Sequence, residues 1–445
     1  MNVYPRLLES LLLPAYDNVR GRSYVKRRLF LRESEWWSRD RVLQFQWREL
    51  RRLLEHVFAS VPYLQRKYSA AGIRLDDIQS WADFRRLPPL TRDEINSHGP
   101  ELCSNAYRGK LLPHATGGST GKPTRFFRTY ESYDWRTAAK DRAYSWSGWR
   151  LGERSVYLWG APVGAHSGLE IWKTRAYERV QRQLIFNTFS QTERLWREIY
   201  ERALAFGPVL IVGYVSSLEQ FAAFLEREHL TLSGVRAVIA AAEPLFPAVR
   251  DAIERGFRAP LFNTYGSREF MSIAGECEFH SGLHVNAENL VVETVDDTSN
   301  EPSEILVTDL HNYGMPFVRY ATGDLGRMSH APCPCGRGLP MLESIEGRVL
   351  DVLRTPDGRT VPGEFFPHLL KEVPEFAEYR VEQRSLDHVV ISAVLERPLS
   401  EKSEALLRHE IAKVLGPAIK WEVETVTEIP RLRSGKRRVT VGLGA

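Results

Sequence analysis

The fold class of this chain is decided by residues 114–130, which read His-Ala-Thr-Gly-Gly-Ser-Thr-Gly-Lys-Pro-Thr-Arg-Phe-Phe-Arg-Thr-Tyr. The middle of this stretch consists of small residues, hydroxylated residues and one lysine: Thr116, Gly117, Gly118, Ser119, Thr120, Gly121 and Lys122. Glycines allow backbone N–H groups to turn inward as an anion-binding nest, and hydroxyls and an ammonium add further donors. The pattern therefore predicts a loop that binds phosphate. A glycine-rich turn without a ligand is the alternative interpretation.

This loop differs from the Walker A loop of P-loop nucleoside triphosphatases. That motif needs four residues between its glycines, and a serine or threonine after the lysine that opens a helix. Here three residues separate Gly117 from Gly121, and Pro123 follows the lysine. Residues 124–129 are rich in β-branched and aromatic side chains, which favour a strand. We therefore expect a phosphate loop between two strands.

Length and composition limit the kinds of protein this can be. A chain of 445 residues is too long for one ordinary core and predicts at least two domains. The net charge of +4 is small for this length and gives no reason to expect nucleic acid as a partner. No run of 18 apolar residues occurs, so we expect no transmembrane segment. Four cysteines make no disulfide framework and fit the cytoplasm.

The hydrophobic pattern predicts how the chain is organised. Residues 44–60 carry apolar side chains at three- and four-residue spacing, as in a helix that packs on a core. Further on, helical segments alternate with short apolar strands, which we expect at residues 156–160, 209–213, 235–242 and 261–264. Such alternation favours a layered α/β fold with a parallel sheet, in which ligands gather at the carboxyl ends of the strands.

Several motifs resemble those of one enzyme superfamily. Residues 116–123 are similar to the ATP-binding signature of the adenylate-forming enzymes, the acyl-CoA synthetase superfamily. Its other signatures follow in the same order: Asn-Thr-Tyr-Gly-Ser-Arg-Glu at 263–269, Thr-Gly-Asp at 322–324, Glu-Gly-Arg at 346–348 and Pro-Arg-Leu-Arg-Ser-Gly-Lys at 430–436. The Leu-Pro-Pro-Leu-Thr-Arg run at 87–92 resembles the phenylacetate–CoA ligase branch, which includes the CapK-like proteins and the coenzyme F390 synthetases.

This resemblance implies a site for ATP and Mg²⁺. Tyr265, followed by Gly266, would stack on adenine, because an aromatic face suits a purine. Glu269 would help to hold Mg²⁺, since this hard cation prefers carboxylate oxygen. Ala242 and Glu243 correspond to the segment that lies against the adenine in the superfamily.

The resemblance also implies the groups that act on ribose and phosphate. Asp324 would accept hydrogen bonds from both ribose hydroxyls. The guanidinium of Arg348 would reach ribose and phosphate, where arginine gives bidentate contacts. Lys436 would reach the α-phosphate and the substrate carboxylate, and would stabilise the charge that builds as the acid attacks phosphorus. With Glu269, these two cations are the implied catalytic residues.

The implied reaction has two steps. A carboxylic acid and Mg·ATP give an acyl-adenylate and pyrophosphate, and the acyl group then passes to a thiol, with coenzyme A as the expected acceptor. The implied architecture is an AMP-binding domain at residues 1–349 and a small, mobile α+β domain at residues 350–445. In the superfamily the small domain rotates at an acidic residue or lysine two positions after the arginine. This chain has Leu350 there, followed by Asp351, so the first step is better supported than the second.

Other functions and details stay open at this point. The acceptor could instead be a hydroxyl that takes the adenylyl group, or an amine or sugar that takes the acyl group, and a non-catalytic scaffold is the alternative outside enzymes. The acid could be aryl, with Trp159, Phe189 and Tyr214 either in its pocket or in the core. A homodimer is one assembly compatible with the sequence.

A second group of residues has the chemistry of a metal site: Cys277, His280, Cys333 and Cys335. Three thiolates and an imidazole suit a closed, structural zinc site, although Cys-x-Cys is not the usual Cys-x-x-Cys spacing. Zinc at this place is also part of the resemblance, since some phenylacetate–CoA ligase relatives carry it. His284 or His330 could take the place of His280, and packed thiols without a metal are the alternative.

Overall fold

The computed structural model describes residues 3–107, 109–115, 124–160, 168–189, 191–296, 302–346, 353–361, 363, 365–370, 372–429 and 439–443. These residues pack into two compact units. The first unit contains the described residues up to 147 and those from 262 to 346, and the second contains residues 148–261 and those from 353 onward. Each unit is therefore built from separate stretches of the chain.

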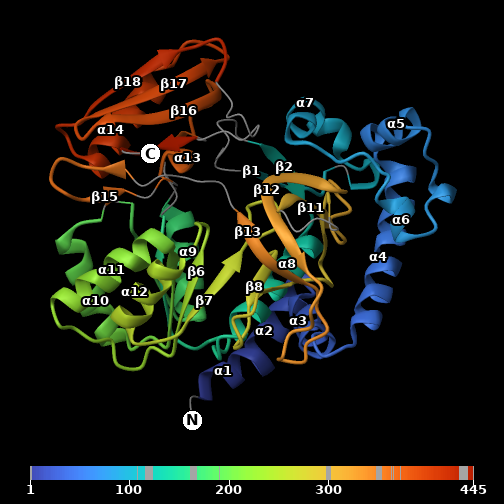
Figure 1. The fold of residues 1–445 in the computed structure, drawn as a ribbon, viewed down its shortest axis with the longest axis horizontal. Coiled ribbons are helices and arrows are strands. Elements are labelled where there is room, and N and C mark those ends of the chain that lie inside the picture. Colours follow the sequence, from blue (N-terminus) through green and yellow to red (C-terminus); the bar gives the residue numbers. More distant parts are fainter. Residues whose placement is uncertain are drawn as a thin grey trace. The chain divides into compact units, whose positions relative to one another are not determined.

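The first unit begins with helices. Their bounds are α1 (Val3–Leu7), a π-helical turn (Leu8–Leu12), α2 (Leu13–Arg20), α3 (Tyr24–Ser34), α4 (Arg39–Ser60), α5 (Pro62–Ala70), α6 (Trp81–Phe84), α7 (Arg92–Leu102) and α8 (Tyr130–Ser145), with 3₁₀ turns at Leu75–Asp77 and Asn105–Tyr107. The long helix α4 (Figure 1) starts where the Ser38 side chain accepts the Arg41 N–H, and it buries an apolar stripe that includes Leu50 and Leu54. The helix predicted at residues 44–60 is confirmed.

Antiparallel strands complete the first unit. In the sheet their order is β7 (Leu261–Tyr265), β8 (Ala274–Glu276), β9 (Leu283–Val285), β13 (Met341–Glu346), β12 (Tyr320–Ser329), β11 (Ser303–Asp309) and β10 (Leu290–Thr294). Separately, β1 (Leu112–Ala115) pairs antiparallel with β2 (Arg125–Arg128). Strands thus lie on both sides of the predicted phosphate loop, and the loop itself, residues 116–123, is outside the described residues.

The second unit contains the predicted parallel sheet. Its strand order is β6 (Ala237–Ala241), β5 (Leu210–Tyr214), β3 (Ser155–Trp159) and β4 (Gln183–Asn187), all parallel. Connecting helices are α9 (Gly168–Gln181), α10 (Glu193–Phe206), α11 (Val215–Arg227) and α12 (Pro247–Phe257), of which the last three gather together in Figure 1. A parallel sheet is covered on both faces, so its strands are runs of apolar residues. The predicted bounds of β3, β5, β6 and β7 are met within two residues, and β4 was not predicted.

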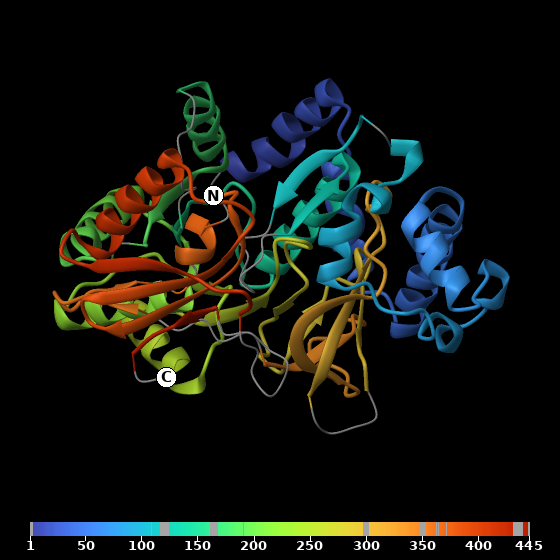
Figure 2. The same cartoon turned by 90° about the horizontal axis from the view of Figure 1, so that it is seen from above.

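The C-terminal stretch adds an α+β layer to the second unit. It contains β14 (Leu353–Arg354), β15 (Thr360–Val361), α13 (Phe365–Leu370), β16 (Phe376–Ser385), β17 (His388–Leu395), α14 (Glu401–Leu415), β18 (Lys420–Thr425) and β19 (Thr440–Val441). The sheet order is β18-β17-β16-β19, and α14 lies across this sheet (Figure 2), with Leu407 and Ile411 in the shared core. The layered α/β fold with a C-terminal α+β part is thereby confirmed. Rotation of that part about residue 350 stays a prediction.

Within the described ranges, no helix combines the length and the apolar character that crossing a membrane requires.

Candidate functional site

Tyr265 and Gly266 stand where strand β7 ends and a tight turn begins. The Ser267 carbonyl accepts the Met271 N–H at 2.7 Å, and the Tyr265 carbonyl accepts the Ile273 N–H at 2.8 Å. A Cβ added to Gly266 would lie 2.0 Å from the Met271 carbonyl oxygen, so only glycine fits the turn. The tyrosine therefore stands at the carboxyl end of strand β7.

Asp324 projects from a bulge in strand β12. The register jumps from Ala321 opposite Leu306 to Leu325 opposite Glu304, so the Thr-Gly-Asp motif lies opposite Ile305 alone. Gly323 makes this possible with a φ of +77°. The bulge lifts Asp324 out of the regular pleat.

The motifs predicted to bind the base and the ribose meet at one hydrogen bond. The Tyr265 hydroxyl donates to Asp324 Oδ2 at 2.8 Å, although the two residues are 59 positions apart. A carboxylate oxygen accepts more than one hydrogen bond. The structure therefore places two of the predicted nucleotide residues side by side.

Glu269 lies nearby in the same unit, and its side chain is almost completely buried. Arg92 Nη2 donates to Glu269 Oε1 at 3.3 Å, and the Tyr320 hydroxyl donates to the same oxygen at 3.3 Å. Burial alone would lower the pKa of the Arg92 guanidinium, but Tyr320 and Glu269 beside it raise that pKa above its ordinary value. Sequence reasoning missed Arg92, whose only signal was its place at the end of the run at 87–92.

Ala242 and Glu243 belong to the second unit and follow strand β6. Ala242 has a φ of +69°, a conformation that costs a residue with a Cβ about 1 kcal/mol or more. Glu243 reaches the N-terminus of α11, where Ser216 donates from its backbone N–H at 2.6 Å and from its hydroxyl at 3.0 Å. Burial raises the pKa of Glu243 to about 7, against the effect of these two hydrogen bonds. This carboxyl caps a helix.

Several predicted residues are outside the described part of the chain. They are Thr116, Gly117, Gly118, Ser119, Thr120, Gly121, Lys122, Arg348 and Lys436, together with the hinge candidates Leu350 and Asp351. Their roles stay predictions from the resemblance.

The three aromatic residues considered for an aryl pocket are packed together. Tyr214 and Phe189 have almost no exposed surface, and Trp159 stacks on Tyr214 with ring centroids 4.5 Å apart. The Phe189 ring also contacts Phe365 of helix α13 at 5.6 Å. In this structure these side chains are part of the core that joins residues 148–261 to the C-terminal stretch.

The cysteines gather as the sequence predicted, with a different histidine. The ligand atoms of Cys277, His284, Cys333 and Cys335 all lie within 4.8 Å of one another. His280 is instead 2.9 Å from Glu276 through Nδ1. The structure therefore groups His284, the alternative histidine, with the three cysteines in place of the predicted His280. Strand pairing explains the difference. Strands β8 and β9 place His284 opposite Gly275, which is two residues before Cys277.

Two separations in this cluster are close to those around a tetrahedral zinc ion. Sulfur ligands at about 2.3 Å and a nitrogen ligand at about 2.0 Å stand ~3.8 Å and ~3.5 Å from each other around the metal. Here Cys277 Sγ and Cys333 Sγ are 3.6 Å apart, and Cys335 Sγ is 3.3 Å from His284 Nε2. A disulfide would need about 2.05 Å. The Arg337 backbone N–H also donates to Cys335 Sγ at 3.4 Å, as expected around a thiolate ligand.

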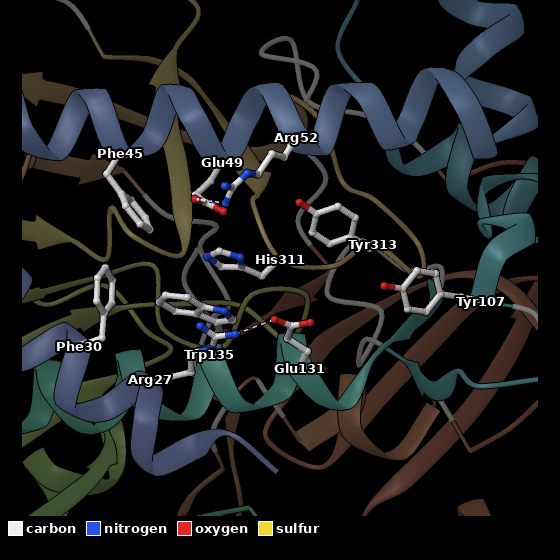
Figure 3. Close-up of a pocket in the computed structure, with 10 residues that line it drawn as sticks. All are labelled: Arg27, Phe30, Phe45, Glu49, Arg52, Tyr107, Glu131, Trp135, His311 and Tyr313. Carbon is white, nitrogen blue, oxygen red and sulfur yellow. Dashed lines mark hydrogen bonds and ion pairs between the residues drawn. The ribbon is translucent and has the colours of Figure 1, made fainter. Parts of the chain in front are cut away.

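A pocket of about 440 Å³ lies elsewhere in the first unit (Figure 3). Its lining residues are Arg27, Phe30, Phe45, Glu49, Arg52, Tyr107, Glu131, Trp135, His311 and Tyr313. Its charges are already paired, Arg27 with Glu131 at 2.8 Å and Arg52 with Glu49 at 2.9 Å. None of the residues predicted to bind nucleotide, acid or metal lines this pocket.

Comparisons with known proteins agree with the motifs and the fold. Residues 353–442 match the family model of the CapK C-terminal domain. The phenylacetate–coenzyme A ligase of Aromatoleum evansii is 25% identical over 432 residues, which cover 91% of this chain and 95% of that protein. Protein CapK of Staphylococcus aureus is 23% identical, with 81% of this chain and 80% of that protein covered.

A solved structure of 2-hydroxyisobutyryl-CoA ligase, in complex with 2-HIB-AMP and CoA in the thioesterification state, has a similar fold. Its TM-score is 0.61 at 21% sequence identity, and the match covers 93% of this chain and 92% of that one. The chain therefore has the fold of the adenylate-forming CoA ligases. Its sequence is similar to phenylacetate–CoA ligases and to CapK, and the resemblance seen in the motifs is confirmed.

Proposed function

We propose that this protein uses ATP to activate a carboxylic acid as an acyl-adenylate, releases pyrophosphate, and passes the acyl group to the thiol of coenzyme A. The observation that carries the proposal is the hydrogen bond from Tyr265 to Asp324. This bond joins the motif proposed to bind the base to the motif proposed to bind the ribose. The chain's relatives include phenylacetate–CoA ligases. Adenylation is needed because a carboxylate is a poor electrophile until a good leaving group, AMP, is attached.

The chain's own residues supply binding and charge stabilisation. Asp324 accepts hydrogen bonds from the ribose hydroxyls, and the Tyr265 ring packs on adenine. Arg348 and Lys436, with the loop at 116–123, neutralise the negative charge that develops on the α-phosphate oxygens. Glu269 fits Mg²⁺ because that ion takes one or two carboxylates and completes its shell with substrate phosphates and water. Bound there, Mg²⁺ would supply positive charge to offset that of the pyrophosphate leaving group.

We also propose that Cys277, His284, Cys333 and Cys335 hold a structural zinc ion. Four protein ligands leave no open coordination position, so the ion stabilises the fold and takes no part in the reaction. It would tie the segment after strand β8 to the segment before strand β13.

The test is pyrophosphate release with Mg·ATP across a panel of aryl and aliphatic acids, with and without coenzyme A. Variants Lys436→Ala and Asp324→Asn are measured beside the matched surface variants Lys402→Ala and Asp251→Asn. We expect acid-dependent release that continues only with coenzyme A. We also expect a loss of at least ~100-fold in Lys436→Ala, the size found when one charge-stabilising donor is removed.

The outcomes separate the remaining alternatives. Release that stops after one turnover with coenzyme A present would keep adenylation and move the acyl group to another acceptor, such as an amine or a sugar. Release that needs no acid but needs a hydroxyl compound would indicate adenylyl transfer. Absence of release with every acid would contradict the proposal and favour a scaffold.

A further inference from the structure

Arg92 is fixed in place by two local features of the chain. Leu90 pairs with strand β12, since its N–H donates to the Arg319 carbonyl at 3.1 Å and its carbonyl accepts the Ala321 N–H at 2.9 Å. Thr91 then caps helix α7, because its hydroxyl accepts the Glu94 N–H while the Glu94 carboxylate accepts the Thr91 N–H at 2.7 Å. Arg92 is the first residue of that helix, so its side chain starts from a rigid point beside β12.

From this point the guanidinium forms a closed triangle of hydrogen bonds. Arg92 Nε lies 3.3 Å from the Tyr320 hydroxyl, Nη2 lies 3.3 Å from Glu269 Oε1, and Tyr320 donates to the same oxygen. The Arg92 and Glu269 side chains are only 15% and 5% exposed. The carboxylate is therefore held at one oxygen by two donors, one of which carries the balancing charge.

We propose that Arg92 is a positioning residue that holds the Glu269 carboxylate in the orientation that receives the Mg²⁺ of Mg·ATP. This inference rests on the proposed function. A glutamate without such partners would spread over several rotamers and would have to be ordered each time the nucleotide binds. An isolated carboxylate would also be costly to keep buried. An arginine hydrogen-bonded to both Glu269 and Tyr320 orders the carboxylate and balances its buried charge before the nucleotide binds.

Lysine cannot reproduce this arrangement fully. Guanidinium presents several N–H donors in a planar fork and reaches two acceptors at once, whereas an ammonium is a point charge. We therefore expect Arg92→Lys to keep the charge balance of Glu269 and to lose part of its orientation. Arg92→Gln should lose both.

The experiment is isothermal titration calorimetry of the whole protein with two probes, Mg·ATP and AMP without metal. AMP tests the base and ribose contacts, and Mg·ATP adds the contact through Glu269. We expect Arg92→Gln to bind Mg·ATP at least 5-fold more weakly than wild type and AMP within 2-fold. Arg92→Lys should lie between the two proteins, and Arg86→Gln, an exposed arginine of the same segment, should match wild type in both titrations.

Three results would overturn the inference. Equal weakening of both probes means that Arg92 supports the whole site or contacts the nucleotide directly. Unchanged Mg·ATP binding means that Glu269 needs no such support, and tighter binding means that Arg92 competes with the metal. Thermal unfolding of each variant checks folding, and Tyr320→Phe offers a second route if Arg92→Gln is unstable. If wild type binds neither probe, the proposed function fails instead.

Discussion

Arg136 and Arg142, both on helix α8, have fully buried side chains, and each faces a carboxylate. Arg142 binds Glu288 through two bonds, at 2.7 Å and 2.9 Å, and Asn286 at 2.9 Å. Arg136 pairs with Asp309 at 2.5 Å. Such pairs contribute little net stability over apolar residues, but removal of one partner leaves a charge buried alone.

At the scale of single residues, Arg142→Met is expected to destabilise the first unit by about 3–5 kcal/mol, because Glu288 stays buried without its partner. Urea unfolding followed by tryptophan fluorescence measures this effect. The control is Arg197→Met, which breaks the exposed pair between Arg197 and Glu228 and should cost about 1 kcal/mol or less. Similar costs for the two variants would show that water or a rearranged side chain solvates Glu288.

The structure also gives the physical reason for single glycines within the sequence motifs. Gly266 and Gly323 belong to two of these motifs, and each position requires glycine for a different reason. One has no room for a Cβ beside Met271, and the other adopts a positive φ in the bulge that presents Asp324. Arg92 shows the opposite case, because nothing in its neighbours along the chain indicates that Glu269 is its partner.

At the scale of elements, Glu243 stabilises the start of helix α11 in a pH-dependent way. Its folded pKa of about 7 is above the ordinary value of 4.5. The folded protein therefore binds the proton more tightly than the unfolded chain, so this stabilisation is complete below about pH 4.5 and is lost as pH rises through 7. A glutamine cannot ionise and keeps its contribution over the whole range.

We therefore expect wild type to lose stability relative to Glu243→Gln between pH 5 and pH 8. The difference should reach roughly 1–2 kcal/mol, after allowance for the solvent that reaches this half-buried group. Thermal melts at both pH values measure it, with the exposed Glu401→Gln as a control. A constant difference between wild type and Glu243→Gln would mean that the carboxyl is already ionised at pH 5.

At the scale of the whole molecule, the proposed zinc ion connects segments far apart in the chain. Cys277 and Cys333 are 56 positions apart, yet their sulfur atoms are 3.6 Å apart. Cys335→Ser should lower the zinc content measured by mass spectrometry from about one ion per chain to near zero. Since about 1 kcal/mol moves the melting temperature by 2–4 °C in a domain of this size, we expect a fall of roughly 5 °C or more.

Two control variants distinguish loss of the zinc site from a general loss of stability. Cys103→Ser changes a cysteine outside the cluster and should keep both zinc and melting temperature. His280→Ala should keep the metal, whereas His284→Ala should lose it. Zinc-free protein purified under reducing conditions without chelators, with no stabilisation on zinc addition, would leave the cluster as packed thiols.

The sequence by itself indicated the fold class and most local structure. Motifs are runs of neighbouring residues, and strands and helices follow from hydrophobic period and from glycine and proline, so helix α4 and strands β3, β5, β6 and β7 were found within a few residues. The motifs themselves resemble those of the adenylate-forming enzymes, whose fold the structure shares.

Tertiary structure decided what depends on distance through space. Residues 148–261 pack with the C-terminal stretch, and Trp159, Phe189 and Tyr214 lie in the resulting core. It selected His284 over His280, and it brought Arg92 to Glu269 across 177 positions. Spacing along the chain gives no information about such pairs, because strand register and the packing of whole elements set which side chains meet.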